Sequence, residues 1–330
     1  MGTPFGRAEY PSGSAGKRGG PSPADRSRSD GLPWPAVPHP ASPGEVSALL
    51  GEQAYLADRG LSTALFLAVT LGRPLLLEGE AGVGKTEVAK AVAAAFGVEL
   101  IRLQCYEGID AGQALYEWDY ARQLLHLRAL SDRAAADDTA VEEVFHARFL
   151  VERPLLRALR AGAGAVLLID EIDRADDEFE AFLLEVLSDF QVTVPEIGTI
   201  RAEQPPVVIV TSNRTRELHD ALKRRCLYHW IDFPSLEREV DIVRVRAPDV
   251  PGELAAKVAQ AVARLRGFDL AKPPGVAETI DWAHAVRALG ADRLGPEVAE
   301  DTLGTVVKDH DDLAMVRRHL ADVVGDDASG

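Results

Sequence analysis

The stretch that decides the fold of this chain reads PLLLEGEAGVGKT and covers residues 74–86. It opens with the apolar run Leu75-Leu76-Leu77, which is typical of a short buried strand. A glycine-rich turn follows, and helical periodicity begins directly after it. We therefore predict a strand over Pro74–Glu78, a tight loop, and a helix over Thr86–Phe96.

The loop fits the pattern GxxxxGK[ST], in which glycines turn backbone N–H groups toward one centre at the start of a helix. Lys85 is placed to reach the β- and γ-phosphates of a nucleotide, and the Thr86 hydroxyl is placed to hold Mg²⁺. Such a pattern arises by accident in about one chain of this length in a hundred. The sequence thus predicts ATP binding by the loop residues Gly79, Glu80, Ala81, Gly82, Val83, Gly84, Lys85 and Thr86.

Two later apolar runs also end in polar side chains. The run Ala165–Ile169 is followed by Asp170 and Glu171, a pair suited to binding a metal and activating a water. Acids after strands also cap helices, as Asp176 or Asp177 is expected to do here. The run Val207–Thr211 leads to Asn213, which either orients the attacking water or forms a turn.

Basic residues end the next helical segment, at Lys223, Arg224 and Arg225. Cations at a helix C-terminus interact favourably with its dipole. An arginine presented there could also reach a nucleotide held by a neighbouring copy of the protein. Both interpretations stay open on the residues alone.

Short strands alternate with longer helices through the first part of the chain, which favours a doubly wound α/β domain with a parallel sheet covered on both faces. We predict one long helical stretch between the second and third strands and no convincing strand after Pro234. The five predicted strands of the sheet are Pro74–Glu78, Glu99–Gln104, Ala165–Ile169, Val207–Thr211 and Leu227–Ile231.

The chain divides into four predicted segments. Residues 1–44 form a disordered tail rich in Pro, Gly and Ser, because so little apolar surface cannot pack a core. Residues 45–233 form the nucleotide-binding α/β domain, residues 234–322 an all-α lid domain with two or three helices after the one that Pro251 opens, and residues 323–330 a flexible end.

Composition disfavours several classes of protein. The net charge of −16 weakens any broad attraction to nucleic acid or anionic membranes. Two cysteines without a CxxC pattern exclude a disulfide scaffold or a zinc module. No apolar run reaches the roughly 18 to 20 residues that span a bilayer. We expect a cytoplasmic protein.

The order of these motifs resembles that of AAA+ ATPases over residues 45–322. The resemblance implies an α/β P-loop fold with five parallel strands in the order 5-1-4-3-2, followed by an all-α lid. It makes Gly79–Thr86 the Walker A loop, Asp170 and Glu171 the Walker B pair, and Asn213 sensor 1. It makes Arg225 the arginine finger, with Arg224 as the second candidate. The sequence departs from the family pattern at sensor 2, an arginine at the start of the lid helix. No arginine begins the helix after Gly275, and Lys272 or Arg287 could take its place.

Two features resemble the MoxR branch of that superfamily. One is a long insertion from about Gly112 to Ala147, and the other is a hairpin of Gln191–Val194 against Thr199–Ala202. The sequences of residues 220–232 and 272–282 are similar to those of the CoxD-like accessory ATPases of carbon monoxide dehydrogenase maturation. This implies a ring, usually a hexamer, that hydrolyses ATP with Mg²⁺ and assists metal-centre assembly of a molybdenum hydroxylase, alongside a von Willebrand factor A domain partner.

Substrate would be bound by the insertion, through Tyr116, Trp118 and Tyr120, or by the hairpin. Those aromatic residues could equally pack the insertion onto the body of the domain.

Three alternative functions are a small-molecule kinase, a motor acting on nucleic acid or another complex, and an ATP-sensing module with little turnover. The kinase fits poorly with a paired Asp-Glu and a dedicated lid. The motor fits poorly with a nearly neutral hairpin, in which Glu196 offsets Arg201.

Overall fold

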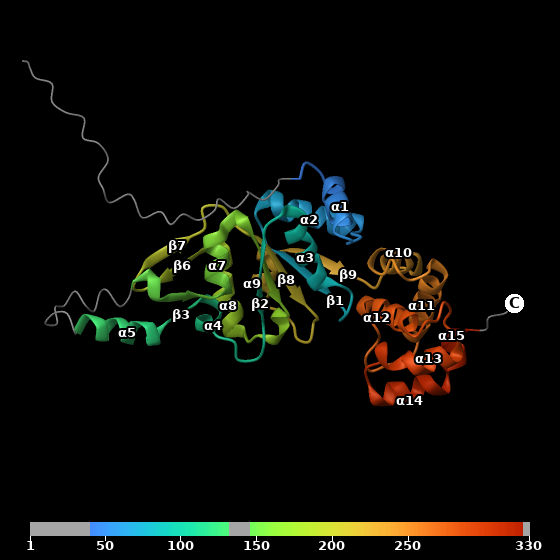
Figure 1. Cartoon of the computed structure of the whole chain (residues 1–330). Helices are drawn as coiled ribbons and strands as arrows, with labels where there is room; N and C mark the ends of the chain where they lie inside the picture. Colours follow the sequence, from blue (N-terminus) through green and yellow to red (C-terminus); the bar gives the residue numbers. More distant parts are fainter. Residues whose placement is uncertain (1–39, 132–145, 326–330) are drawn as a thin grey trace, which may run out of the picture. The chain divides into compact units, whose positions relative to one another are not determined.

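The computed structural model describes residues 40–131 and 146–325. The central feature is a five-stranded parallel sheet, coloured from teal to gold in Figure 1. Its strands stand in the order β2-β5-β8-β1-β9, which confirms the expected order 5-1-4-3-2. The strands are β1 (Leu75–Gly79), β2 (Glu99–Gln104), β5 (Ala165–Asp170), β8 (Val207–Ser212) and β9 (Leu227–Ile231).

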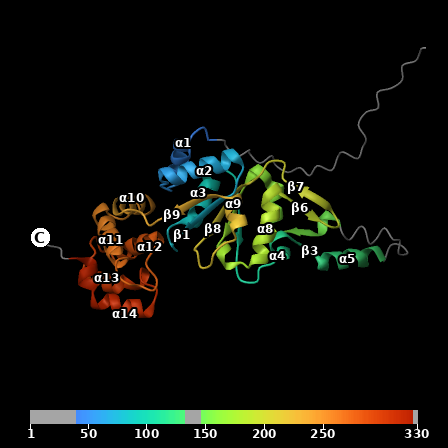
Figure 2. The same ribbon diagram turned by 180° about the vertical axis from the view of Figure 1, so that it is seen from behind.

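Successive side chains of the strands enter two separate hydrophobic cores, as expected for a sheet covered on both faces. Leu75 and Leu77 pack with one helical layer, whereas Leu76 between them packs with the other. The first layer is α1 (Pro43–Glu52), α2 (Arg59–Leu71) and α3 (Lys85–Phe96). The second layer, seen from behind in Figure 2, is α4 (Ala111–Leu115), α7 (Pro154–Ala161), α8 (Asp177–Asp189) and α9 (Asp220–Arg225).

The helices start where their capping residues predict. Ser42 and Asp58 accept hydrogen bonds from the first turns of α1 and α2, and Asp176 does so for α8. Pro at the first position of α1 fits because its missing N–H has no partner there anyway. Helix α1 thus begins at Pro43, inside the predicted tail of residues 1–44, and residues 1–39 of that tail lie outside the described residues.

The prediction of one long helical stretch between β2 and β5 is wrong. The described part of this segment also contains α5 (Tyr120–Ser131), two strands and two short 3-10 turns, Ala147–Phe149 and Gly162–Gly164. The strands β3 (Tyr116–Trp118) and β4 (Leu150–Glu152) pair antiparallel. Strands of three residues show no readable period, and their pairing joins segments more than 30 residues apart. The predicted insertion over Gly112–Ala147 is described except for residues 132–145.

The predicted hairpin is present as β6 (Gln191–Val194) and β7 (Gly198–Arg201). Its second strand starts one residue earlier than expected. Gly198 has a φ of +100°, a conformation that glycine adopts without steric cost, and it pairs with Val194 where the chain reverses.

The C-terminal region is helical and has its own core around Trp282. Ser235 caps its first helix as predicted, but four helices follow α11 instead of two or three. The last helix ends at Val324, and residues 326–330 lie outside the described residues. Its helices are α10 (Leu236–Arg246), α11 (Gly252–Leu265), α12 (Val276–Ala288), α13 (Pro296–Thr302), α14 (His310–Arg318) and α15 (Leu320–Val324), with a 3-10 turn at Leu303–Thr305. Among the helices that the structure describes, none is long and apolar enough to cross a membrane.

Candidate functional site

The glycine-rich loop joins the buried strand β1 to the N-terminus of α3. Gly82 and Gly84 have φ values of +79° and +94°, which other residues adopt at a cost. At Gly79 a Cβ would lie 2.2 Å from the Ile231 carbonyl oxygen of the neighbouring strand β9, so no side chain fits. The backbone geometry therefore requires glycine at these three positions.

Lys85 is buried and its Nζ donates hydrogen bonds to the carbonyl oxygens of Gly79 and Glu80, each at 2.7 Å. Burial lowers the pKa of this ammonium, and the carboxylates of Asp173, Glu80, Asp170 and Glu171 oppose that shift. The cation is held inside the loop, where a phosphate oxygen would replace the two carbonyl partners.

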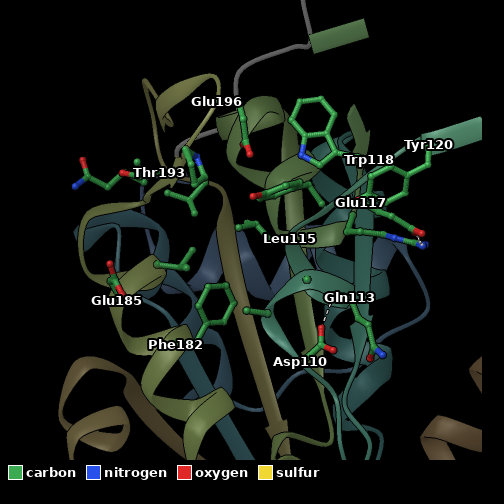
Figure 3. A pocket seen from close by; sticks show the side chains of 18 residues that line it. Asp110, Gln113, Leu115, Glu117, Trp118, Tyr120, Phe182, Glu185, Thr193 and Glu196 are labelled. Atoms are coloured by element: carbon green, nitrogen blue, oxygen red, sulfur yellow. Dashed lines mark hydrogen bonds and ion pairs between the residues drawn. The ribbon is translucent and has the colours of Figure 1, made fainter. Parts of the chain in front are cut away.

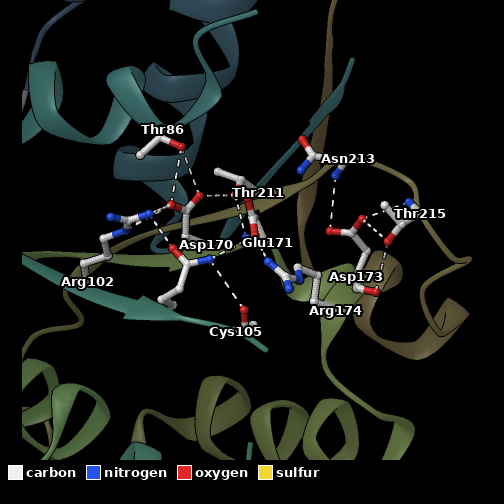
Figure 4. Close-up of polar contacts among 11 residues, drawn as sticks. Thr86, Arg102, Cys105, Asp170, Glu171, Asp173, Arg174, Thr211, Asn213 and Thr215 are labelled. Carbon is white, nitrogen blue, oxygen red and sulfur yellow. Dashed lines mark hydrogen bonds and ion pairs between the residues drawn. The ribbon is translucent and has the colours of Figure 1, made fainter. Parts of the chain in front are cut away.

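Asp170 ends β5 and is almost fully buried. Its Oδ1 accepts hydrogen bonds from Thr211 Oγ1 at 2.6 Å and Thr86 Oγ1 at 3.1 Å (Figure 4). Its Oδ2 accepts from Arg102 of β2, with Nε at 3.0 Å and Nη2 at 2.5 Å. Thr86 and Asp170 thus bring a hydroxyl and a carboxylate together, and oxygen donors of this kind suit Mg²⁺.

Glu171 follows in the left-handed conformation, with a φ of +55°, which is uncommon for a residue other than glycine. Its backbone N–H donates to Thr211 Oγ1 at 3.0 Å, so one threonine positions both acids. Its Oε2 accepts from Gln104 Nε2 and from Arg174 Nη1, each at 3.1 Å. The carboxylate that would activate a water is therefore held by an amide and a guanidinium in this structure.

Asn213 follows β8, and its backbone is anchored by a residue that the sequence analysis did not single out. Asp173 is buried and accepts from Asn213 N at 3.2 Å, Thr215 N at 2.8 Å and Thr215 Oγ1 at 2.7 Å. These contacts, seen in Figure 4, fix the loop that carries Asn213. Asp173 comes three residues after the end of β5, and this position was the sequence signal that could have identified it.

One cavity of about 870 Å³ unites these groups. It is within the size range of small-molecule sites. It is lined by most of the glycine-rich loop and by Asp170, Glu171 and Asn213, and the α1–α2 loop and helices α10 and α12 complete it. Tyr55, in the α1–α2 loop, has its pKa raised chiefly by burial. The lining therefore combines polar groups from the strand termini with Tyr55, Ile242 and Ile280.

The two candidates for sensor 2 lie elsewhere. Neither Lys272 nor Arg287 is among the described residues that line the cavity. Arg287 pairs with Asp292 at 2.5 Å. Two arginines of α10 do line it, namely Arg238, whose Nη2 donates to the Ala57 carbonyl at 2.9 Å, and Arg246. Their spacing of eight residues, which places both on one helix face, was the signal that could have found them.

Arg224 and Arg225 are exposed at the C-terminus of α9 and do not line this cavity. The side chain of Arg73 donates to the carbonyl oxygens of Arg225 at 3.1 Å and Arg224 at 2.8 Å. Arg73 thereby supplies hydrogen-bond donors to carbonyl groups at the C-terminus of α9 and fixes the backbone from which both guanidinium groups project.

A second cavity, of about 950 Å³, lies between the β6–β7 hairpin, α8 and the segment around β3 (Figure 3). Trp118 is buried there and packs with Phe149 and Val194, whereas Tyr120 is 64 % exposed. Of the aromatic residues of the insertion, Trp118 therefore packs the insertion onto the body and Tyr120 stays available on the surface.

Comparison with known proteins agrees with this architecture. Residues 74–226 match the family model described as AAA domain (dynein-related subfamily). This segment is an AAA domain of the AAA+ ATPase family, and the chain has the AAA+ P-loop fold, with a five-stranded parallel sheet and a helical C-terminal region.

Relatives are distant. The uncharacterized protein YojN of Bacillus subtilis (strain 168) is 28% identical over 209 residues, which cover 61% of this chain and 60% of YojN. Protein NorQ of Paracoccus denitrificans (strain Pd 1222) is 24% identical over 277 residues, or 82% of this chain and 92% of NorQ. A solved structure of the RuvB Holliday junction branch migration motor of Thermotoga maritima is 20% identical with a TM-score of 0.43, covering 80% of this chain and 70% of that one.

Proposed function

We propose that this protein is an ATPase that converts ATP and water to ADP and phosphate and uses the resulting movement to remodel a protein partner. The observation that carries the proposal is the single cavity lined by the phosphate loop, Asp170, Glu171 and Asn213. A loop that binds phosphates would need neither the acid pair nor Asn213 for binding alone. Their convergence favours hydrolysis over storage or sensing of the nucleotide.

Each group has a chemical task in this proposal. The loop N–H groups and Lys85 bind the β- and γ-phosphates. The Thr86 hydroxyl and Asp170 would hold Mg²⁺, which supplies positive charge against the phosphate oxygens. Glu171 takes the proton of the attacking water, and Asn213 orients that water. Gln104 and Arg174 both donate to Oε2 of Glu171, so in this proposal the other carboxylate oxygen, Oε1, takes the proton.

The proposal places Arg225, with Arg224 as the second candidate, at the nucleotide of a neighbouring protomer. Both guanidinium groups are exposed on α9, away from the cavity of their own chain, and Arg73 holds the helix end from which they project. A ring, which we take to be a hexamer, would complete each site with this arginine. Hydrolysis would then be coupled to the angle between neighbours.

We further propose membership of the MoxR branch. The β6–β7 hairpin and the insertion around β3 and α5 support it, and so does the match to NorQ, which extends well beyond the AAA domain to 82% of this chain. In this proposal the client contacts the surface of the second cavity, which Tyr120 of α5 and Glu196 in the turn of the hairpin both line (Figure 3). The CoxD-like sequence of residues 220–232 supports a molybdenum hydroxylase client and a von Willebrand factor A domain partner.

The test uses Glu171→Gln on the full chain, with ATP binding and phosphate release measured separately. The proposal requires phosphate release to fall at least about a hundredfold while ATP binding persists. Unchanged phosphate release would contradict it, and release that is equally low in the wild type would indicate an ATP-sensing module.

The same variant, loaded with ATP, serves as a trap for partners in the source cell. Recovery of molybdenum hydroxylase subunits together with a von Willebrand-type protein supports the narrower assignment. Recovery of DNA, or stimulation of phosphate release by DNA, would replace it with a nucleic-acid motor.

A further inference from the structure

Arg102 makes a contact that the proposed reaction does not use. It lies on β2, the edge strand of the sheet, and its side chain reaches the carboxylate of Asp170 on the adjacent strand β5. The side chain of Arg102 is 50 % exposed, whereas that of Asp170 is 2 % exposed. A guanidinium at the rim of the site is thus paired with an almost fully buried acid.

The two oxygens of Asp170 have different partners. Oδ1 accepts from the hydroxyl groups of Thr211 and Thr86 at 2.6 and 3.1 Å. Oδ2 accepts both Arg102 contacts, at 2.5 and 3.0 Å, and it is also 3.4 Å from Thr86 Oγ1. Thr86 thus lies near both oxygens and is nearer to Oδ1, whereas Arg102 contacts Oδ2.

Charge explains why a cation is needed there. A buried carboxylate without a counter-charge is costly, and two hydroxyl donors compensate for only part of that cost. Arg102 supplies a full positive charge and two donor groups in a fixed plane. The ionised acid can therefore be kept in place before any metal arrives.

We propose that Arg102 is a resident counter-cation of Asp170 that competes with the divalent cation for Oδ2, so that metal loading requires the guanidinium to swing away from the carboxylate. Its half-exposed position at the sheet edge lets it do so without disturbing the core. Arg102 stabilises the metal-free site and sets the metal concentration at which the site fills. The inference rests on the proposed use of a nucleotide and metal at this site.

The test is binding of Mn²⁺ in the presence of ADP to the full chain, followed by electron paramagnetic resonance, so that no turnover is involved. Arg102→Met is expected to bind Mn²⁺ about fivefold more tightly than the wild type, as fits a partly screened ion pair. In EDTA the same variant is expected to melt about 2–4 °C lower, because Asp170 loses its counter-charge. In an Asp170→Asn background the melting effect of Arg102→Met should disappear.

Two controls separate competition for Oδ2 from other effects. Arg174→Met removes a guanidinium from the same site that contacts Glu171 and not Asp170, and it should change Mn²⁺ affinity by less than about twofold. Arg157→Met removes the partner of Glu99, at the far end of β2, and should leave Mn²⁺ affinity unchanged. Equal tightening in Arg174→Met and Arg102→Met would overturn the proposal, because it would reflect net charge alone.

The outcomes distinguish this proposal from the function on which it rests. If the wild type binds no Mn²⁺ with ADP, the proposed nucleotide function fails. If the wild type binds and Arg102→Met binds equally or more weakly, only the competition is refuted. Should Arg102→Met not fold, Arg102→Lys keeps the charge but loses the two-donor plane; tightening of about twofold supports the proposal, and weaker or unchanged binding overturns it.

Discussion

Gly275, the residue before helix α12, lies directly against Gly82 of the phosphate loop. A Cβ on Gly275 would come 2.5 Å from the Cα of Gly82, and Val276 N donates to the Gly82 carbonyl at 2.9 Å. The helical C-terminal region thus contacts the phosphate loop through backbone, at the point where the motif pattern lacks a sensor 2 arginine. This contact joins the helical C-terminal region directly to the proposed nucleotide site.

Gly275→Ala should weaken this contact, since its methyl group would have to displace the backbone of Gly82. We expect the free energy of unfolding to fall by about 1–3 kcal/mol and ATP affinity to fall about tenfold. Chemical denaturation and nucleotide titration measure the two effects. Gly295→Ala is the matched control: Gly295 precedes α13 with a φ of −87°, against −86° at Gly275, and has open space around its Cα. An equal effect in both variants would refute the contact's role.

Asp173→Ala should lower turnover by loosening the loop that carries Asn213. The buried carboxylate accepts three hydrogen bonds from Asn213 and Thr215, and its removal leaves those donors without partners, which costs about 1–3 kcal/mol of stability. We expect kcat to fall with little change in ATP binding. Asp177→Ala, an exposed acid nearby, is the control. If kcat is retained despite the lost stability, Asn213 is not the residue that orients the water.

Arg225→Ala should reduce turnover about a thousandfold while each protomer still binds ATP, because the proposed arginine acts on the neighbour's nucleotide. The sharper measurement mixes Arg225→Ala with Glu171→Gln. The Arg225→Ala protomer keeps its own acid pair, and a Glu171→Gln neighbour keeps the arginine, so mixing should restore part of the activity. Mixtures that stay inactive, in rings whose formation is verified by light scattering, would argue against a shared site; Arg224→Ala then tests the second candidate.

Cys105 and Cys226 should resist alkylation in the folded protein. Burial raises the pKa of each thiol to about 12, from an ordinary value of 9.0. At pH 8.5 the thiolate fraction is then about a thousandfold lower than in an unfolded chain, and access is restricted as well. Iodoacetamide labelling read by mass spectrometry should therefore modify both residues only after denaturation.

The same two shifts predict a pH dependence of stability. The fold keeps both thiols neutral, so their contribution to stability is present below the unfolded pKa near 9 and is lost as pH rises above it, when the unfolded chain releases protons first. A Cys105→Ala, Cys226→Ala variant should show a smaller loss of stability between pH 8 and 10 than the wild type. An identical pH profile would indicate that the thiols are not protected by burial.

Much of the site could be predicted because its residues are adjacent in sequence to the elements that place them. The GxxxxGK[ST] loop follows its strand directly, and Asp170 and Asn213 stand at or just after the ends of buried strands. The carboxyl ends of parallel strands meet at one edge of the sheet, so local pattern was enough to bring these groups together. Their positions around one cavity agree with that expectation.

Other features depend on contacts between segments far apart in the chain. The β3–β4 pair and the anchoring of Asn213 by Asp173 leave no periodic trace. The spacing of Arg238 and Arg246 indicates a shared helix face, but not the cavity that this face lines. In each case the residues by themselves are compatible with several structural roles. The partner that selects one of them is fixed by packing and not by spacing.

The sequence by itself thus determined the phosphate loop, the five core strands and the acids that follow them, because each is a local pattern of apolar, glycine and polar residues. Only the tertiary structure decided that Arg102 from an edge strand faces Asp170 and that Gly275 rests on Gly82. Both contacts join residues more than 60 positions apart, and the fold creates them when it packs separate elements at van der Waals distance.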